Sequence, residues 1–514
     1  MKNLNLVIVL LLFLIFVSCS SKNDPESQVI VRINVSNEDN IDDLENRGLP
    51  IHEVLEDSRG NEYIVSITTR SLLDRMQLSY QILDSCSGRC GEYLIADSLG
   101  DSSIRTRAAA ETTVLHDDGK NVIVRFSKAL SNSLPKMGFE LALLQSSDSD
   151  VNSEVADRIS NKKLKNTKSL SDIIVSSSTK KSSVETMISG VSDDSLLTYI
   201  KDLSGENSVS ISSGTVNNTQ VSGTVTIRSR ITESMDLNYA QQYVYDKLKI
   251  LSSTPNFLSP PTPSFDSWSV AGYVGSNVIG EIPGKTTPNE IILLVAHLDS
   301  IPGEDRNNVC RQTNYDSTHA PGADDNASGS AMLLEIARLM GKKEYDRTIR
   351  FLFTTGEEQG KLGSIGYAKK AKDRNDTILA VINLDMNAYW NTDISGTKIY
   401  HVKTNKISVA EKYNRDKALS DIFFSAVNTY GLSSGQNAGI VPTPIPDGDT
   451  YSDHDSFWNK DYSAIWIIED DSRDVWNPYM HKSCDRYDKI SIPYCANQTK
   501  SVLATTAHLA KIRD

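Results

Sequence analysis

Three absences narrow what this protein can be. No apolar run in the sequence reaches the roughly 20 residues that a membrane-spanning helix needs. The formal charge of -13 is spread over the chain without a basic cluster, which argues against nucleic acid as a partner. No internal repeat of fixed period is visible. What is present, 39% apolar and 23% charged residues over 514 positions, is typical of a globular chain with several domains of roughly 100–200 residues each.

The longest apolar run, residues 6–17, has the length of the hydrophobic region of a signal peptide. The following Phe16-Val17-Ser18-Cys19 resembles a bacterial lipobox, in which the cysteine is lipidated after cleavage, although Phe16 departs from the usual leucine. We therefore expect a lipoprotein-type signal peptide at 1–19 and a polar tether at 20–28. The protein is expected to be exported to the bacterial cell envelope and anchored to a membrane through Cys19, or secreted if the signal is an ordinary cleaved one.

The sequence has only six cysteines, and four of them form two close pairs, Cys86/Cys90 and Cys484/Cys495. In an oxidising envelope both pairs are expected to form local disulfides, which leaves Cys310 over, although sequence alone does not prove connectivity. Zinc binding by thiolates is the competing interpretation. It is weaker, because Cys86 and Cys90 have no second pair at zinc-finger spacing.

Small α+β modules are predicted in the first third of the chain. Residues 29–100 alternate strand-like and helix-like segments and resemble a small ferredoxin-like accessory domain. Residues 101–145 are expected to add a β-rich segment after a linker-like stretch at 102–112. Residues 146–185 are rich in serine, aspartate, lysine and asparagine, so we expect a polar linker there.

Residues 186–514 alternate helices with short, strongly apolar runs. These runs are predicted to be strands buried on both faces, and they lie at 291–296, 349–353, 378–384 and 464–468. Such a pattern is typical of an α/β domain in which helices flank a mostly parallel mixed sheet. In open sheets of this class ligands bind beyond the carboxyl ends of the strands.

Polar side chains follow three of these strands. His297 comes directly after the first, and Asp299 is placed to hold the far nitrogen of its imidazole. Glu357 and Glu358 follow the second strand, and Asp385 ends the third, where burying an uncompensated carboxylate would be costly. A cation would compensate it. Taken singly each motif is weak, because adjacent glutamates are often a solvated surface pair.

A turn of small residues at 320–329 brings Asp324 and Asp325 to the start of a predicted helix. Carboxylates at this place are commonly helix caps. Small neighbours also allow metals and backbone to approach closely, which a bridging carboxylate needs.

In order along the chain, these motifs resemble those of the dizinc aminopeptidases of the bacterial leucyl aminopeptidase type, metallopeptidase family twenty-eight. The matching motifs are His297-Leu298-Asp299, Gly322-Ala-Asp-Asp-Asn-Ala-Ser-Gly329, Glu357-Glu358, Leu384-Asp385-Met386 and Asn477-Pro-Tyr-Met-His481. The resemblance covers roughly residues 191–514 and implies a zinc exopeptidase fold for the domain at 186–514.

The resemblance also implies roles for these residues. Two zinc ions would be bound, one by His297 and Asp385, the other by Glu358 and His481, with Asp325 bridging both and a cis peptide after it. Glu357 would be the general base for a metal-bridging hydroxide, with Asp299 behind His297. His454, in a Ser-Asp-His motif, would support the site without binding metal.

The predicted function is a zinc-dependent exopeptidase that hydrolyses the N-terminal peptide bond of peptides or proteins. A carboxypeptidase or dipeptidase with the same two-metal site is the nearest alternative, and inactivity on N-blocked peptides would favour the aminopeptidase. A glutaminyl cyclase works with one zinc, so the presence of both His297 and Asp385 argues against it. A non-catalytic receptor-like protein is disfavoured by the intact Glu357. The sequence indicates neither the preferred N-terminal residue nor the oligomeric state.

The first prediction concerns the N-terminus. We expect mass spectrometry of the mature, membrane-associated protein to find Cys19 as a lipid-modified first residue, with a Cys19→Ala variant as the unmodified control. An unmodified N-terminus beyond Cys19 would instead show an ordinary cleaved signal.

Overall fold

The structure is a computed structural model. It describes residues 27–35, 41–88, 90–99, 101–145, 179–255, 257–310, 318–391, 397–433, 439–472 and 475–513. The predicted signal peptide and most of the predicted tether and polar linker lie outside these residues. No helix in the described part of the chain is long and apolar enough to cross a membrane.

The chain divides into two compact units. The first unit contains Met1–Ile95, Ala109–Phe126 and Leu144–Lys165, and the second contains Ala96–Ala108, Ser127–Leu143 and Asn166–Asp514. Two short pieces from the first third of the chain therefore belong to the unit that carries the C-terminal domain.

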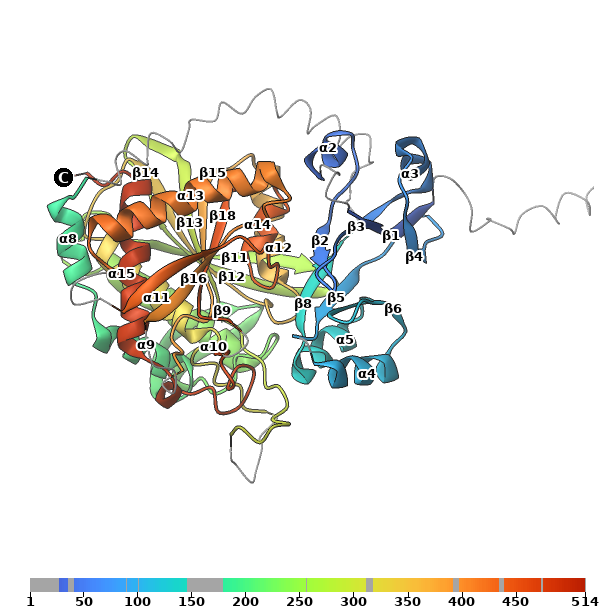
Figure 1. Ribbon diagram of the computed structural model, residues 1–514. Helices are drawn as coiled ribbons and strands as arrows, with labels where there is room; N and C mark the ends of the chain where they lie inside the picture. Colours follow the sequence, from blue (N-terminus) through green and yellow to red (C-terminus); the bar gives the residue numbers. More distant parts are fainter. Residues whose placement is uncertain are drawn as a thin grey trace, which may run out of the picture. The chain divides into compact units, whose positions relative to one another are not determined.

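A four-stranded sheet with the order β2-β3-β1-β4 forms most of the first unit (Figure 1). Its elements are β1 (Gln28–Asn34), α2 (Ile41–Asn46), β2 (Glu53–Glu56), β3 (Glu62–Thr69), α3 (Arg70–Met76) and β4 (Gln81–Ser85). Strand β1 pairs antiparallel with both β3 and β4. This succession and strand order are those of a ferredoxin-like module. The sequence pattern did not predict β2, whose four residues begin and end with glutamate.

The same succession of elements occurs a second time. It runs through β5 (Tyr93–Asp97), α4 (Ser102–Glu111), β6 (Val114–Asp117), β7 (Asn121–Arg125), α5 (Lys128–Ser133), a 3-10 turn (Pro135–Met137) and β8 (Glu140–Leu144). The sheet order, β6-β7-β5-β8, repeats that of the first sheet. The linker expected at 102–112 was wrong, because these residues form α4. That helix buries only Ile104 and Ala108, so its sequence shows no apolar periodicity.

An eight-stranded mixed sheet is the centre of the second unit. Its order is β11-β12-β14-β13-β15-β18-β16-β17, and the four central strands are parallel. The strands are β11 (Thr262–Val270), β12 (Tyr273–Ile282), β13 (Thr287–His297), β14 (Arg347–Thr354), β15 (Thr377–Leu384), β16 (Lys398–Lys403), β17 (Ile440–Ile445) and β18 (Ala464–Glu469). A separate hairpin joins β9 (Ser208–Val216) and β10 (Thr219–Thr226). The predicted strands β13, β14, β15 and β18 and the predicted mostly parallel sheet are confirmed.

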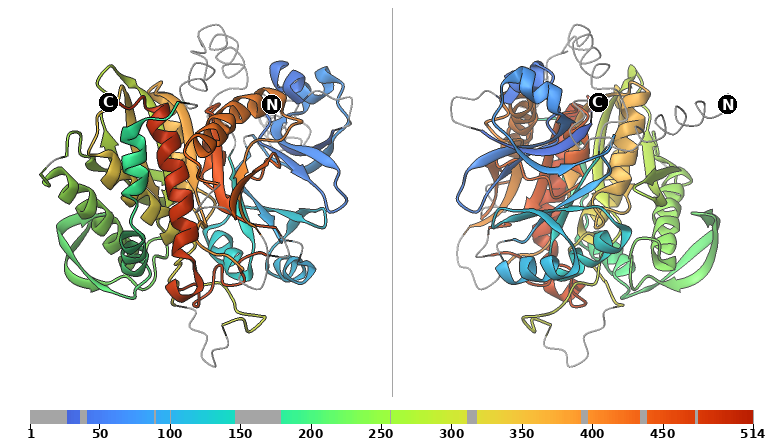
Figure 2. Two further views of the ribbon diagram at one scale, coloured as in Figure 1. Left: turned by 60° about the vertical axis from the view of Figure 1, so that its left-hand side comes forward. Right: turned by 90° about the vertical axis from the view of Figure 1, so that its right-hand side faces the viewer.

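Helices cover both faces of this sheet (Figures 1 and 2). They are α8 (Ser182–Ser189), α9 (Asp193–Leu203), α10 (Met235–Ser252), α11 (Ala327–Met340), α12 (Leu362–Asp373), α13 (Ala410–Thr429), α14 (His454–Trp458) and α15 (Ile492–Leu509), with a 3-10 turn at Tyr487–Lys489. Strand β13 shows why helices are needed on both faces of the sheet, because its side chains alternate between two hydrophobic cores. Ile292 and Leu294 pack in the core with α10, α11 and α15, whereas Leu293 and Val295 pack in the core with α12 and α14.

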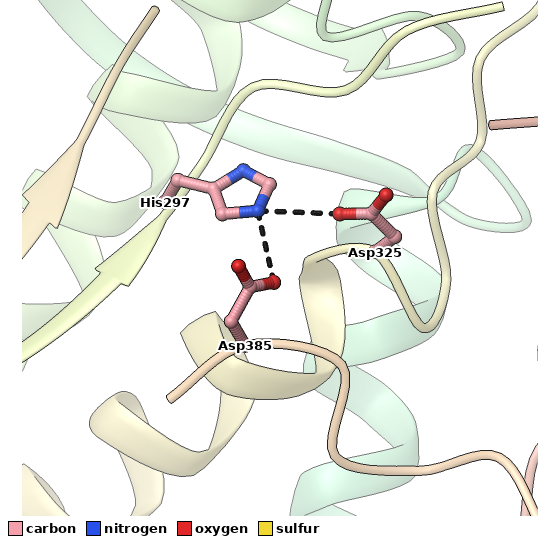
Figure 3. A group of neighbouring side chains, drawn as sticks. All are labelled: His297, Asp325 and Asp385. Atoms are coloured by element: carbon pink, nitrogen blue, oxygen red, sulfur yellow. Dashed lines mark hydrogen bonds and ion pairs between the residues drawn. The ribbon is translucent and has the colours of Figure 1, made fainter. Parts of the chain in front are cut away.

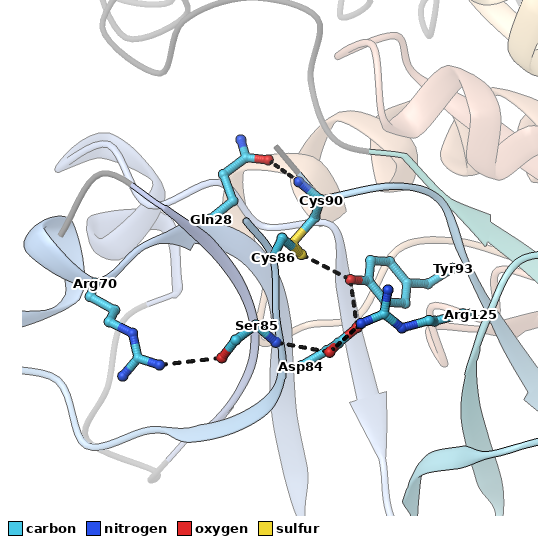
Figure 4. The surroundings of a disulfide bond; sticks show 8 residues. All are labelled: Gln28, Arg70, Asp84, Ser85, Cys86, Cys90, Tyr93 and Arg125. Atoms are coloured by element: carbon cyan, nitrogen blue, oxygen red, sulfur yellow. Dashed lines mark hydrogen bonds and ion pairs between the residues drawn. A yellow bond between two sulfur atoms is a disulfide. The ribbon is translucent and has the colours of Figure 1, made fainter. Parts of the chain in front are cut away.

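The structure corrects one predicted disulfide. Cys86 and Cys90 are joined as expected, beside Tyr93, whose hydroxyl donates to Asp84 (Figure 4). Cys484, however, is bonded to Cys310, 174 residues away, and Cys495 is a buried free thiol. Cys495 lies in the first turns of α15 with its side chain in the core, while Cys484 lies in the loop that follows His481. Closeness in sequence therefore does not bring these two sulfur atoms together.

Peptide mapping under non-reducing conditions is expected to recover Cys86–Cys90 and Cys310–Cys484, and to find Cys495 alkylated only after unfolding. A Cys310→Ser variant should expose Cys484 to alkylation and leave the Cys86–Cys90 peptide unchanged. Recovery of a Cys484–Cys495 peptide from the folded protein would contradict this connectivity.

Candidate metal centre

His297 and Asp385 meet because neighbouring parallel strands end at the same edge of the sheet. His297 is the last residue of β13, and Asp385 directly follows β15, the strand that pairs with it. The Nε2 atom of His297 lies 3.0 Å from Oδ1 of Asp385 (Figure 3). The other oxygen of Asp385 accepts a hydrogen bond of 2.6 Å from the Ser452 hydroxyl. The carboxylate is thus fixed with one oxygen toward the imidazole.

The carboxylate of Asp325 lies between two imidazoles. Its Oδ1 is 3.2 Å from Nε2 of His297, and its Oδ2 is 3.1 Å from Nε2 of His481. The backbone of this turn is held by Asp485, whose carboxylate accepts hydrogen bonds from the N–H groups of Asp324 and Asp325 at 3.0 Å each. Asn326 caps the following helix α11, and the peptide bond between Asp325 and Asn326 is cis, as the family resemblance implied.

Glu358 and His481 complete the group. Glu358 follows β14, and its Oε2 lies 3.0 Å from Nε2 of His481. Two sets of ligand atoms result, one from His297, Asp325 and Asp385 and one from Asp325, Glu358 and His481, each within 4.8 Å of one another. All five side chains expected to bind metal are brought together, and they are buried.

The contacts of Asp299 differ from the expected one, in which its carboxylate would hold the far nitrogen of the His297 imidazole. Its carboxylate oxygen is 3.8 Å from Nδ1 of His297, and the nearer contact of that nitrogen, at 3.2 Å, is the backbone carbonyl of Asp299. The carboxylate instead accepts hydrogen bonds of 3.2 Å from the backbone N–H groups of both Glu357 and Glu358. Asp299 therefore fixes the backbone that carries the two glutamates.

Two further residues support the site: Arg230, which lies in the region covered by the family resemblance, and Asp485, which was not singled out from the sequence. Arg230 is fully buried, and its guanidinium donates to the carbonyls of Leu298, Pro321 and Gly322 at 2.6 to 2.9 Å, which ties the His297 loop to the Asp325 turn. Arg230 and Asp485 act through backbone groups, and a pattern of side chains in sequence carries no signal for such contacts.

His454 stays away from the two ligand sets, as expected. Its ring stacks on Trp466 with centroids 5.0 Å apart, and its Nε2 lies 2.7 Å from the carbonyl of Asp449. Burial lowers the pKa of His454 to about 3. The adjoining Ser452 is the residue of that motif that contacts the site, through Asp385.

The pKa shifts of the site residues indicate negative charge that is not compensated within the site. Burial raises the pKa of Glu357 well above its usual value, and burial together with Asp325 raises that of Glu358 to about 7. Burial alone would lower the pKa values of His297 and His481, but the carboxylates around them hold both well above the usual value. Three carboxylates and two imidazoles form a donor set that suits zinc, and two divalent cations would compensate this charge.

A further carboxylate, Glu140, comes from the first third of the chain. Its Oε1 lies 3.9 Å from Nε2 of His481, within the same compact unit. Burial, with Asp325 and Glu358 nearby, raises the pKa of Glu140 to about 8. This residue was not among those singled out from the sequence.

Comparison with known proteins agrees with these observations. Residues 277–506 match the family model described as Peptidase family M28. A probable aminopeptidase of Saccharomyces cerevisiae is 29% identical over 246 residues, covering 45% of this chain and 57% of that protein. The alkaline phosphatase isozyme conversion protein of Escherichia coli is 35% identical over 180 residues, covering 34% of this chain and 46% of that protein. The chain thus spans about half the length of these curated relatives.

Two solved structures share the fold. The LapA aminopeptidase of Legionella pneumophila superposes with a TM-score of 0.56 at 17% identity, covering 82% of this chain and 98% of that one. LapB from the same organism superposes with a TM-score of 0.54 at 18% identity, covering 82% and 99%. The mixed sheet, its flanking helices and the small N-terminal modules therefore belong to a known architecture.

Metal removal should destabilise the folded protein, because it leaves the buried carboxylates without a counter-charge. We expect a chelator to lower the melting temperature and zinc to restore it. Free zinc at about 100 times its dissociation constant would contribute about 2.7 kcal/mol. Differential scanning fluorimetry with elemental analysis measures both the shift and the metal content.

An Asp325→Asn variant is the control for this experiment, since its melting temperature should respond much less to zinc. An equal response of the variant and the natural protein would contradict the place of Asp325 between two metals.

Proposed function

Because residues 277–506 match the model of Peptidase family M28, we propose that this protein is a zinc-dependent aminopeptidase that removes the N-terminal residue of peptides or proteins. One observation carries the proposal: Asp325 gives one oxygen to each of two histidines, and each histidine is paired with a further carboxylate. This arrangement makes two adjoining metal positions that share one ligand. The same activity is supported by two relatives, the probable aminopeptidase of Saccharomyces cerevisiae and leucine aminopeptidase 1 of Arthroderma otae.

In this proposal His297 and Asp385 would hold one zinc ion, Glu358 and His481 would hold the other, and Asp325 would be a ligand of both. When bound, the ions would supply a water of lowered pKa and polarisation of the scissile carbonyl. The residues of this chain set the geometry beforehand. Ser452 holds Asp385, Asp485 holds the backbone of Asp325, and the buried setting excludes competing water.

Glu357 is proposed as the general base. Its side chain is buried beside the ligands, and its backbone is fixed through Asp299. From this position the carboxylate can accept a proton from the attacking water and pass that proton to the leaving amine. The chain's own contribution to the chemical step is this proton transfer.

We also propose that the protein is exported and attached to a membrane through a lipid on Cys19. The support is the apolar run at 6–17 followed by a lipobox-like sequence. These residues lie outside the part of the chain that the structure describes.

The variant Glu357→Gln tests the mechanism, because it keeps the shape of the side chain and replaces the basic carboxylate by an amide. We expect unchanged zinc content and a fall in kcat of roughly 100-fold to 10,000-fold on aminoacyl p-nitroanilides. Glu344→Gln is the matched control, since Glu344 is 39% exposed and paired with Lys285. A Glu357→Gln variant that keeps a tenth of the activity would remove Glu357 from the mechanism.

The same assay tests the direction of cleavage. The natural protein is expected to hydrolyse aminoacyl anilides and not their N-acetylated counterparts. Equal hydrolysis of N-acetylated substrates, or release of C-terminal residues from peptides, would contradict the aminopeptidase proposal and favour the carboxypeptidase alternative.

A further inference from the structure

Glu140 reaches the candidate metal centre from outside the family domain. It is the first residue of β8, more than a hundred positions before the region that matches the peptidase family. Its side chain is 16% exposed, and its Oε1 atom has no hydrogen-bond partner in the described part of the chain. A buried carboxylate oxygen without a donor is costly, so a bound group is expected to satisfy it.

The segment that carries Glu140 is fixed to the second unit by several contacts. The backbone N–H of Glu304 donates to the carbonyl of Lys136 at 2.8 Å, and the guanidinium of Arg306 donates to the carbonyl of Met137 at 2.5 Å. Glu304 is also held by Arg107 through two hydrogen bonds of 2.7 and 2.8 Å. The neighbouring Gly303 donates its N–H to the carbonyl of His481. The same loop therefore holds both the Glu140 segment and the backbone of His481.

Strand β8 also packs, near its other end, against the loop that follows the two glutamates. A Cβ atom on Gly360 would lie 3.2 Å from Cβ of Leu143, and Gly360 has a φ of +107°. A side chain at this position would be strained and crowded. The glycine permits the close approach of β8 to the residues that follow Glu358.

The position of Glu140 differs from that of a metal ligand. It lies on the Nε2 side of His481, the side that Asp325 and Glu358 also face. Glu140 does not belong to the set of ligand atoms that lie within 4.8 Å of one another. Its carboxylate therefore borders the position of the second metal from outside, where a substrate group would be placed.

The charges around this position favour a cationic substrate group. Asp325, Glu358 and Asp385 would cancel three of the four positive charges of two zinc ions, and Glu357 would cancel the fourth. Glu140 then adds a further negative charge beside the position of the second metal. A free α-ammonium group would balance this charge, whereas a C-terminal carboxylate would be repelled.

From this geometry we propose that Glu140 binds the α-ammonium group of the substrate's N-terminal residue. The inference rests on the proposed function and deepens it, because it assigns the selection for a free amino terminus to a segment outside the peptidase domain. Charge-assisted hydrogen bonds of this kind are the strong ones in proteins.

The test compares the zinc-loaded full chain with its Glu140→Gln variant. Calorimetry would measure the binding of leucinol, which has the amine but no scissile bond, and of 4-methylpentan-1-ol, which lacks the amine. We expect the variant to bind leucinol about 10-fold to 100-fold more weakly and the alcohol with unchanged affinity. Zinc content should remain at the natural level. Glu111→Gln, an exposed position at the end of α4, is the matched control.

Kinetics give a second readout. The variant should show a raised KM for leucyl p-nitroanilide and a much smaller change in kcat. Unchanged leucinol affinity in the variant would overturn the proposal. Loss of zinc would also overturn it, because Glu140 would then be a metal ligand. So would a gain in activity, because Glu140 would then obstruct substrate binding. Failure of the natural protein to cleave aminoacyl anilides would refute the proposed function, while the leucinol measurement would still decide the role of Glu140.

Discussion

The carboxylate of Asp325, with one oxygen near each of two histidines, is the interaction on which the rest of the site depends. Placing it there needs a turn in which two successive backbone N–H groups point at a buried acceptor, and Asp485 supplies that acceptor. The same turn must remain attached to the loop that follows β13, and Arg230 provides this attachment through carbonyl groups. The buried carboxylate of Asp325 is thus positioned by Asp485, which contacts its backbone N–H, and by Arg230, which contacts carbonyl groups of the same turn. The side chain of Asp325 stays free to face metals.

The core of the site could be predicted from the sequence because parallel strands bring their carboxyl ends to one edge. His297, Glu358 and Asp385 follow strands whose apolar runs are unmistakable, so their convergence follows from the fold class. The assignment of these residues to one metal or the other does not follow from the fold class. The family resemblance implied that assignment, together with the choice of His481 over His454. The structure places His454 against Trp466, where its ring serves packing.

The features that the sequence did not reveal leave no local pattern of side chains from which they could be predicted. Helix α4 buries too few apolar residues to show a period, and β2 is too short to show alternation. The second ferredoxin-like succession repeats the topology of the first without a visible sequence repeat. Cys310 finds Cys484 only because the loops carrying them meet in the folded chain. Asp299 holds two amides instead of the imidazole, a difference that side-chain spacing cannot express.

The division of the chain explains why the charge of the site is not a property of the peptidase domain alone. The pieces Ala96–Ala108 and Ser127–Leu143 are packed with that domain although they precede it by more than a hundred residues. They bring Arg107 to Glu304, and Glu140 to the vicinity of His481. All five candidate metal-binding residues lie in the region that matches the family model. The negative charge that borders these residues comes from Glu140, which lies outside the domain. In the proposal made above, the carboxylate that distinguishes the two ends of a peptide is Glu140, which belongs to a segment outside the family domain.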